Sequence, residues 1–257
     1  MRFILRPLQY LYVIYAFLVF IILMIPVFIW SILVLPLGRI RSGNLVFYAC
    51  MVWADIWFLL VFIRHRNIYL EPLDKDKACI FVSNHISYLD SAIFPKAFRH
   101  PVRPLGKVEM VRIPVFGFIY RNAIVTVDRS SPAQRTRSVQ ALKSILKKGI
   151  SILVFPEGTF NTTHRPMKEF YDGAFRIAIE TGSPIRPVLL LDSYTRMHYS
   201  SIFTLNPGRS RALFLPSIPV EGLQLNDVAQ LREKVFRIMS ETAVAYGASW
   251  IDENAGS

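Results

Sequence analysis

The sequence predicts an α/β fold in which helices flank a mixed, largely buried sheet, with a hydrophobic membrane helix pair at the N-terminus. Residues 8–37 contain no charged side chain, and residues 45–63 form a second apolar run that only Asp55 interrupts. In the rest of the chain, short apolar runs of strand length alternate with amphipathic stretches of helical length, which is the pattern of α/β domains. We therefore divide the 257 residues into N-terminal membrane-anchoring helices, residues 1–66, and one folded domain, residues 67–257.

The first apolar run is longer than the ~20 residues that a membrane-spanning helix needs. It is also too long for the core of a signal peptide, and no small-x-small cleavage site follows it. A two-span hairpin would place Arg39 and Arg41 on the outside, against the positive-inside tendency. A helix pair embedded in one leaflet keeps all basic residues at the same surface, and we favour it over two complete spans. Pro26 and Pro36 are expected to bend or end the first helix.

The composition indicates an anionic lipid surface as a partner. The formal net charge is +12, and 53% of the residues are hydrophobic. Residues 1–66 hold six arginines against Asp55 alone, so the basic surplus is densest beside the most apolar segment. This distribution favours membrane lipids over nucleic acid, for which the sequence carries no recognisable binding module. Cys50 and Cys79 lie in apolar segments and are expected to be buried, and no spacing of His and Cys predicts a metal site.

The alternation of segments predicts the elements of the folded domain in order. Buried strands are expected at residues 78–83, 123–127, 150–155, 185–191 and 211–215. Helices are expected at residues 88–98, 133–148, 170–181 and 226–246. Asn226 is the expected N-cap of the last helix, and Gly182 and Gly247 are expected stop signals. The second of these helices is basic, which indicates a solvated face or, alternatively, a contact with the membrane or an acidic partner; its basic residues are Arg135, Arg137, Lys143, Lys147 and Lys148.

The polar turn Asn84-His85-Ile86-Ser87-Tyr88-Leu89-Asp90 directly follows the first expected strand. A neutral imidazole is a suitable base near pH 7, and a carboxylate can fix its tautomer and stabilise the imidazolium that forms. His85 and Asp90 would supply both groups across the turn that opens a helix. A structural alternative exists, because Ser87 followed three residues later by Asp90 also resembles a capping box.

A second polar turn, Phe155-Pro156-Glu157-Gly158-Thr159-Phe160, follows the strand expected at residues 150–155. A strand that ends in Pro-Glu-Gly-Thr gives a tight turn with free backbone N–H groups and a hydroxyl near a carboxylate. Such a turn can position a polar acceptor. An ordinary turn at a strand end is the alternative interpretation.

Four blocks in this order resemble the glycerolipid acyltransferase family, specifically the 1-acyl-glycerol-3-phosphate (lysophosphatidic acid) acyltransferases. The blocks are Asn84-His85…Asp90, which is the family's His-x4-Asp signature; Lys107-Val108-Glu109 with Pro114, Gly117 and Asp128-Arg129; Phe155-Pro156-Glu157-Gly158-Thr159; and Pro184-Ile185-Arg186-Pro187-Val188. They cover roughly residues 78–190 at spacings compatible with the family.

The chain departs from the family pattern at three positions. Ala123 and Thr126 stand where the second block usually has Gly and Phe, and Phe160 stands where the third block usually ends in Arg. Since that Arg is associated with the polar end of the acceptor, Phe160 leaves the acceptor head group open. Arg165 and His164 are candidates to compensate for the missing charge.

The resemblance implies transfer of a fatty acyl group from acyl-CoA or acyl carrier protein to the sn-2 hydroxyl of lysophosphatidic acid. The product would be phosphatidic acid, an intermediate of phospholipid biosynthesis. His85 would be the general base and Asp90 its orienting partner, while Lys107 and Arg129 would contact the acceptor phosphate, as point charges suit such a site. The acceptor site would be shaped by Glu157, Gly158 and Thr159. Asp128 is interpreted as structural.

The implied mechanism needs no cofactor, because the thioester is already activated. Ser83 and Ser87 are therefore not expected to be nucleophiles, and backbone N–H groups at the helix start after His85 are expected to stabilise the oxyanion. The acceptor resides in the bilayer and the donor head group is water-soluble. This combination places residues 67–257, as the catalytic domain, at the cytoplasmic face of the cell membrane.

Two other functions stay open at this point. One is the same acyl transfer to another lysolipid acceptor, which Phe160 favours. The other is a non-catalytic, membrane-anchored lipid-binding protein, against which the presence of both His85 and Asp90 argues.

Overall fold

The computed structural model describes residues 2–74, 77–127 and 132–252. These residues form a seven-stranded sheet with the strand order β1-β7-β6-β2-β5-β3-β4. The strands are β1 (Ile63–Tyr69), β2 (Ile80–Ser83), β3 (Val102–Lys107), β4 (Val125–Val127), β5 (Ser151–Val154), β6 (Ile185–Leu190) and β7 (Gly208–Phe214). Strands β2 to β6 run in one direction, whereas β7 is antiparallel to β6 and β1 is parallel to β7. The sheet is therefore mixed, and the predicted α/β fold class is confirmed.

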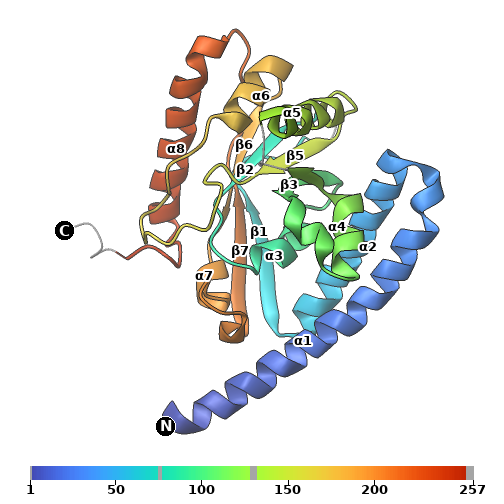
Figure 1. Ribbon diagram of the computed structural model, residues 1–257. Coiled ribbons are helices and arrows are strands. Elements are labelled where there is room, and N and C mark those ends of the chain that lie inside the picture. Colours follow the sequence, from blue (N-terminus) through green and yellow to red (C-terminus); the bar gives the residue numbers. More distant parts are fainter. Residues whose placement is uncertain (1, 75–76, 128–131, 253–257) are drawn as a thin grey trace.

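Helices cover both faces of the sheet. They are α1 (Arg2–Leu33), α2 (Arg39–Leu60), α3 (Asp90–Ala97), α4 (Phe116–Ala123), α5 (Pro132–Leu146), α6 (Gly173–Thr181), α7 (Ser193–Arg196) and α8 (Val228–Ala245). Figure 1 shows α5, α6 and α8 on one side of the sheet and α2, α3 and α4 on the other. Two hydrophobic cores result, one on each face. Ile80 and Val82 of β2 belong to the core beneath α5, α6 and α8, and Phe81 belongs to the core on the side of α2, α3 and α4. Because neighbouring side chains of a strand point to opposite faces, β2 is apolar at each of these positions and buried throughout.

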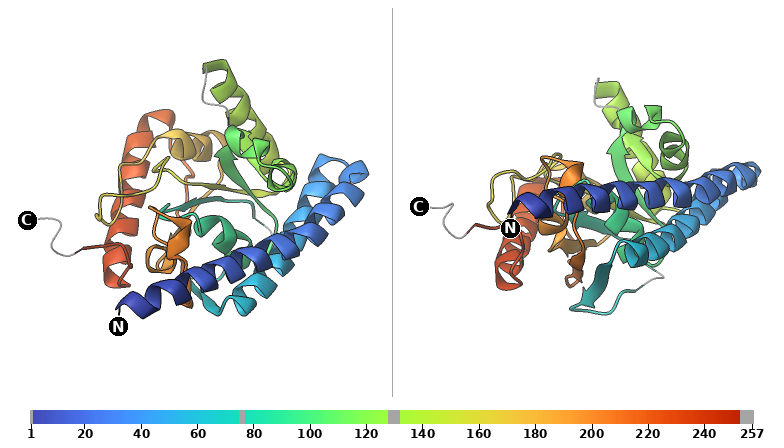
Figure 2. Two further views of the ribbon diagram at one scale, coloured as in Figure 1. Left: turned by 60° about the horizontal axis from the view of Figure 1, so that its bottom comes forward. Right: turned by 90° about the horizontal axis from the view of Figure 1, so that it is seen from below.

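The N-terminal helices α1 and α2 pack along each other as an antiparallel pair (Figure 2). The indole N–H of Trp57 donates to the carbonyl of Ala16 at 3.0 Å, and the hydroxyl of Tyr12 donates to the carbonyl of Val61 at 2.7 Å. Pro26 lies inside α1, which continues to Leu33, whereas Pro36 lies in the short 3₁₀ helix that follows. Both helices are long and apolar enough to cross a membrane by length and composition.

Helix α2 is attached to the rest of the protein near both of its ends. Asp55, which interrupts the second apolar run, pairs with Lys96 of α3 at 2.7 Å and with Arg99 at 3.0 Å. Near the other end of the helix, Arg103 of β3 donates to the side-chain oxygen of Asn44 at 2.5 Å. The strand β1, which follows α2 directly, extends across residues 66 and 67. The position of the boundary between the two parts of the chain therefore stays a prediction.

Most predicted elements are present, with shifted ends. The strands β1 and β3 and the helix α4 were not expected, and the strand predicted at residues 123–127 starts at Val125 because Ala123 still belongs to α4. Asn226 is not an N-cap, since it lies inside a 3₁₀ helix before α8 whose capping box is formed by Gln224 and Asp227. Gly182 ends α6 in the left-handed conformation, as predicted.

Candidate active site

Three of the segments that the sequence singled out lie at one edge of the sheet. Strand β2 pairs with β5 in parallel register, and β5 pairs with β3 in the same way. The carboxyl ends of the three strands therefore lie side by side. His85 follows β2, Glu157 follows β5, and Lys107 is the last residue of β3. Ligands of α/β proteins bind in this position, outside the carboxyl ends of parallel strands.

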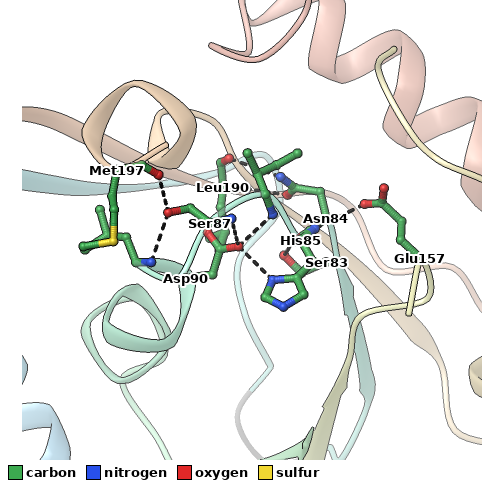
Figure 3. A network of polar contacts seen from close by, with 10 residues as sticks. Ser83, Asn84, His85, Ser87, Asp90, Glu157, Leu190 and Met197 are labelled. Atoms are coloured by element: carbon green, nitrogen blue, oxygen red, sulfur yellow. Dashed lines mark hydrogen bonds and ion pairs between the residues drawn. The ribbon is translucent and has the colours of Figure 1, made fainter. Parts of the chain in front are cut away.

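His85 and Asp90 form a hydrogen-bonded pair (Figure 3). Nδ1 of His85 lies 2.9 Å from Oδ2 of Asp90, whose side chain is fully buried, whereas the side chain of His85 is 23% exposed. An ionised carboxylate only accepts hydrogen bonds, so Nδ1 carries the proton and Nε2 keeps a free lone pair. This is the tautomer that a general base requires.

Asp90 also closes the turn before α3. The same oxygen, Oδ2, accepts the backbone N–H groups of Ile86 at 2.8 Å and Ser87 at 2.9 Å, while the hydroxyl of Ser87 accepts the N–H of Leu89 at 3.1 Å. Only half of the predicted capping box is present, since Asp90 accepts from the N–H of Ser87 but the hydroxyl of Ser87 accepts from Leu89 and not from Asp90. The N–H groups of Ile86 and Ser87 are engaged by this carboxylate, so the expectation that N–H groups directly after His85 stabilise the oxyanion is wrong for these two.

Buried side chains fix the turn to the neighbouring elements. The amide of Asn84 receives the N–H of Leu190 at 2.8 Å and donates to its carbonyl at 3.3 Å, which ties the end of β2 to the end of β6. The hydroxyl of Ser87 donates to the carbonyl of Met197 at 2.5 Å. Ser87 is fully buried and positions the turn, which agrees with the expectation that it is not a nucleophile.

The turn after β5 packs against His85. Gly158 has a φ of +72°, a left-handed conformation that glycine adopts without the cost of a side chain. Glu157 accepts the N–H of His85 at 3.2 Å with one oxygen and the N–H of Lys168 at 3.0 Å with the other. Burial raises the pKa of Glu157 to about 8, while the two N–H groups and the charge of Lys168 act in the opposite direction. Because both oxygens of Glu157 are engaged, this side chain holds the segments of the site together.

Aromatic rings surround the imidazole. Phe155 stacks on the His85 ring with 4.2 Å between centroids, and Phe160 contacts it edge-on at 4.5 Å. Tyr88 packs edge-on against Phe160 at 4.9 Å. Phe160 thus forms an apolar wall beside His85 at the position where the family pattern has Arg.

The two cations predicted to contact the phosphate are placed differently. Lys107 is exposed at the end of β3, on the same edge as His85 but separated from β2 by β5. Arg129, like Asp128, lies outside the described residues. The structure therefore brings together His85, Asp90, Glu157, Gly158 and Thr159, and the roles of Lys107 and Arg129 stay predictions.

One residue near the site was not found from the sequence. Lys168 lies in the irregular segment between β5 and α6, and its ammonium donates to the hydroxyl of Thr159 at 2.8 Å. No motif or periodicity marks this position. Among the residues that the structure describes, no group of three or more His, Cys, Asp or Glu side chains is placed to hold a metal ion.

The mixed sheet and the His–Asp pair at its carboxyl edge define an acyltransferase type of α/β domain. The model of a family described as Acyltransferase matches residues 65–191. The chain therefore contains an acyltransferase domain over these residues. Within it, the resemblance to 1-acyl-glycerol-3-phosphate acyltransferases that the four blocks indicate is confirmed by the relatives that the chain matches.

Those relatives come from plants and bacteria. The chain is 28% identical over 191 residues to a 1-acyl-sn-glycerol-3-phosphate acyltransferase of Cocos nucifera, covering 71% of this chain and 60% of that protein. It is 29% identical over 175 residues to a protein of the same name from Salmonella typhimurium, covering 66% and 70%. The chain thus spans about three fifths of the length of the Cocos protein.

A solved structure has the same fold over nearly the whole chain. It is the crystal structure of the 1-acyl-sn-glycerophosphate (LPA) acyltransferase PlsC from Thermotoga maritima, which superposes with a TM-score of 0.77 and covers 98% of this chain and 100% of that one. The sequence identity is 23%, so this likeness concerns the fold, which includes the N-terminal helix pair.

Proposed function

We propose that this protein transfers a fatty acyl group from a thioester to the sn-2 hydroxyl of lysophosphatidic acid, which yields phosphatidic acid. The observation that carries this proposal is the 2.9 Å contact between Nδ1 of His85 and a fully buried Asp90, at the sheet edge where the other motif residues gather. The names of the Cocos and Salmonella relatives support the choice of acceptor, since both are called 1-acyl-sn-glycerol-3-phosphate acyltransferases.

The proposed reaction is a direct transfer. Nε2 of His85 takes the proton of the acceptor hydroxyl as the hydroxyl oxygen attacks the thioester carbonyl carbon. The tetrahedral intermediate then collapses, the carbon–sulfur bond breaks, and the thiolate takes the proton from the imidazolium. Asp90 stabilises the imidazolium in between, because its carboxylate accepts the Nδ1 proton. No acyl-enzyme, metal or cofactor takes part in this scheme.

The developing oxyanion needs hydrogen-bond donors that are not already used. Within the described residues, the backbone N–H groups of Thr159 and Phe160 donate to no other group, and they lie in the turn that packs against His85. We assign the oxyanion site to this turn. Preorganised backbone donors of this kind typically contribute about 10²–10³ in rate.

The helix pair supports a location at the membrane. One side of α1 is buried against α2 and the domain through Val13, Ala16 and Val27, whereas Leu11, Leu18 and Ile22 on its other side are more than half exposed. An apolar stripe of this kind lies in lipid at the interface. We place the domain at the cytoplasmic face of the cell membrane, where acyl-CoA or acyl carrier protein delivers the thioester and the basic residues meet anionic phospholipids.

A second acceptor class has a specific observation in its favour. Phe160 lies against His85 where a cation would attract a phosphate, so another lysolipid with a different head group is the alternative acceptor. The transfer chemistry would be unchanged.

The test is acyl transfer from labelled long-chain acyl-CoA and acyl carrier protein to a panel of lysolipids, with the detergent-purified chain and its His85→Ala variant. We expect acylation of lysophosphatidic acid and a loss of at least ~10³-fold in the variant, because the base is removed. Acylation of other lysolipids only would move the proposal to the second acceptor class. No His85-dependent transfer with either donor would leave lipid binding without catalysis as the function.

A further inference from the structure

Within the described residues, none of the side-chain contacts of His85 is made by a cation, although a phosphate acceptor requires cations in the site. The imidazole is enclosed by Phe155 and Phe160, and Tyr88 extends the aromatic wall. Such a wall suits the glycerol backbone and the acyl chain. A phosphate monoester needs charged donors instead, because burying it beside apolar rings without them is costly.

Lys168 is held beside the turn that packs against His85. Its backbone N–H donates to Glu157 at 3.0 Å, and Glu157 in turn accepts the N–H of His85 at 3.2 Å. Its ammonium donates to the hydroxyl of Thr159 at 2.8 Å. The backbone and the side chain of Lys168 therefore both bind the turn that contains Glu157 and Thr159. The residue after Thr159, Phe160, contacts the imidazole of His85.

The ammonium of Lys168 has capacity for an anion. In the part of the chain that the structure describes, no carboxylate lies within ion-pair distance of it, whereas Lys96 and Lys143 are paired with Asp55 and Glu180. An ammonium has three N–H donors, and the Thr159 hydroxyl accepts one of them. The other two donors have no partner among the described residues.

The other cations of the same segment are directed elsewhere. Nδ1 of His164 is 3.1 Å from the carbonyl of Trp250, and its ring contacts Tyr194. Arg165 lines a hollow of about 330 Å³ beside α8, together with Arg232 and Lys168. Neither His164 nor Arg165 has a contact with the turn comparable to that of the Lys168 ammonium.

We propose that Lys168 binds the phosphate monoester of the acceptor and makes the enzyme select an anionic head group. This inference rests on the proposed acyl transfer to lysophosphatidic acid and assigns its head-group site. The ammonium would replace the charge that Phe160 removes from the end of the motif. Lys168 is a specificity-determining residue in this scheme and takes no part in proton transfer.

The test compares two acceptors that differ only in the phosphate, 1-acyl-glycerol 3-phosphate and 1-acyl-glycerol. Lys168→Met removes the charge and keeps the length of the side chain. We expect it to raise KM for the phosphate acceptor by about tenfold to a hundredfold, the range of a charge-assisted hydrogen bond, with kcat less affected. Activity with the neutral acceptor should stay unchanged, and Lys168→Arg should restore most of the affinity.

Lys147→Met is the matched control, because it removes the same charge at an exposed position after the far end of α5. Equal losses on both acceptors would assign Lys168 a structural role and overturn the proposal. A rise in KM for acyl-CoA instead of the acceptor would place Lys168 at the phosphates of the donor and also overturn it. A wild-type chain that does not acylate the phosphate acceptor would contradict the proposed function itself.

A second measurement needs no variant. The wild-type chain is treated with an amine-modifying reagent, and modification of Lys168 is followed by mass spectrometry. We expect 1-acyl-glycerol 3-phosphate to protect Lys168, whereas 1-acyl-glycerol leaves it reactive. Equal modification with both acceptors would contradict the proposal even if Lys168→Met does not fold.

Discussion

Asp90 serves two purposes through a single oxygen, which accepts from Nδ1 of His85 and from the backbone N–H groups of Ile86 and Ser87. The first contact sets the tautomer of the base, and the other two hold the turn that places it. Because all three contacts use Oδ2, the position of the imidazole and the start of α3 are fixed by the same buried carboxylate.

Asp90→Asn should lower kcat by about 10³–10⁴-fold with little change in KM, because a neutral amide cannot stabilise the imidazolium and can favour the wrong tautomer. Steady-state kinetics with a long-chain thioester and lysophosphatidic acid give both constants. Asp172→Asn, at an exposed position paired with Arg232, is the control and should retain activity. A kcat within tenfold of the wild type would refute the role given to Asp90.

The raised pKa of Glu157 predicts how the stability of the protein depends on pH. Its pKa is raised from 4.5 to about 8 by burial, so the folded state holds a proton that the unfolded state releases above pH 4.5. This contribution to stability is full at low pH and is lost as the pH rises from about 4.5 to about 8. We expect the thermal midpoint to fall over this window in the wild type and to fall less steeply in Glu157→Gln. Glu241→Gln, at an exposed position, is the control. If the thermal midpoint of Glu157→Gln falls with pH as steeply as that of the wild type, the raised pKa is contradicted.

At the scale of elements, the packing of α2 against α4 and the side chain of Arg103 depends on the absence of a side chain at Gly43. A Cβ at this position would lie 2.7 Å from Nη2 of Arg103 and 2.8 Å from the carbonyl oxygen of Asn122. Both neighbours are held in place, since Arg103 is buried and donates to Asn44, and the oxygen of Asn122 belongs to the backbone of α4. The close approach of α2 to the backbone of α4 therefore requires glycine.

Gly43→Ala should reduce the free energy of unfolding by about 1–3 kcal/mol, the usual cost of overpacking. Thermal unfolding in detergent measures the change. Gly173→Ala is the matched control: its Cβ would meet no atom within 4 Å, and the position begins α6. That control should be neutral or slightly stabilising, because alanine favours the helix. Equal stability of Gly43→Ala and the wild type would show that α2 can move away from α4.

The elements that the sequence predicts well are those with a local signal. Strand β2 is apolar at both faces, and the two polar turns directly follow β2 and β5, so His85, Asp90 and Glu157 could be placed from the sequence. Strand β1 could not, because Arg64, His65 and Arg66 resemble the charged end of a membrane segment and only pairing with β7 makes them a strand. Lys168 could not be predicted either, because it lies in an irregular segment without periodicity and its contacts with Glu157 and Thr159 are made only in the folded structure.

At the scale of the whole molecule, the edge of the sheet that carries His85 is also the edge along which α1 runs (Figures 1 and 2). Strands β1 and β7 run opposite to β2, so they begin at this edge. Gln9 of α1 donates to the carbonyl of Leu205, just before β7, at 2.6 Å, and Phe28 packs on Phe118 of α4, which follows β3. Helix α1 and the edge of the sheet that carries His85 therefore lie on the same side of the protein, as the proposed lipid acceptor requires.

The attachment of α2 at both ends limits how the helix pair can enter a membrane. Asn44, near its start, is bound by Arg103, and Asp55, near its end, is bound by Lys96 and Arg99. The 22-residue helix is about 33 Å long, similar to the ~30 Å thickness of the hydrocarbon core, and the two attachment points lie about 16 Å apart in its middle part. A helix that crosses this core cannot have both of these points on a domain that stays in water on one side. The structure therefore favours a pair that lies in one leaflet over two complete spans.

This argument predicts the side on which the connection between α1 and α2 is found. Leu37→Cys, in that connection, and Leu225→Cys, before α8, are both at exposed positions. In sealed vesicles of known orientation, a membrane-impermeant maleimide should label both variants from the same side. The native Cys79 is buried and Cys50 is partly buried, so the wild-type chain measures the background labelling. Labelling of Leu37→Cys from the opposite side would establish two spans and would require the contacts of Arg103 and Asp55 with α2 to open in the membrane.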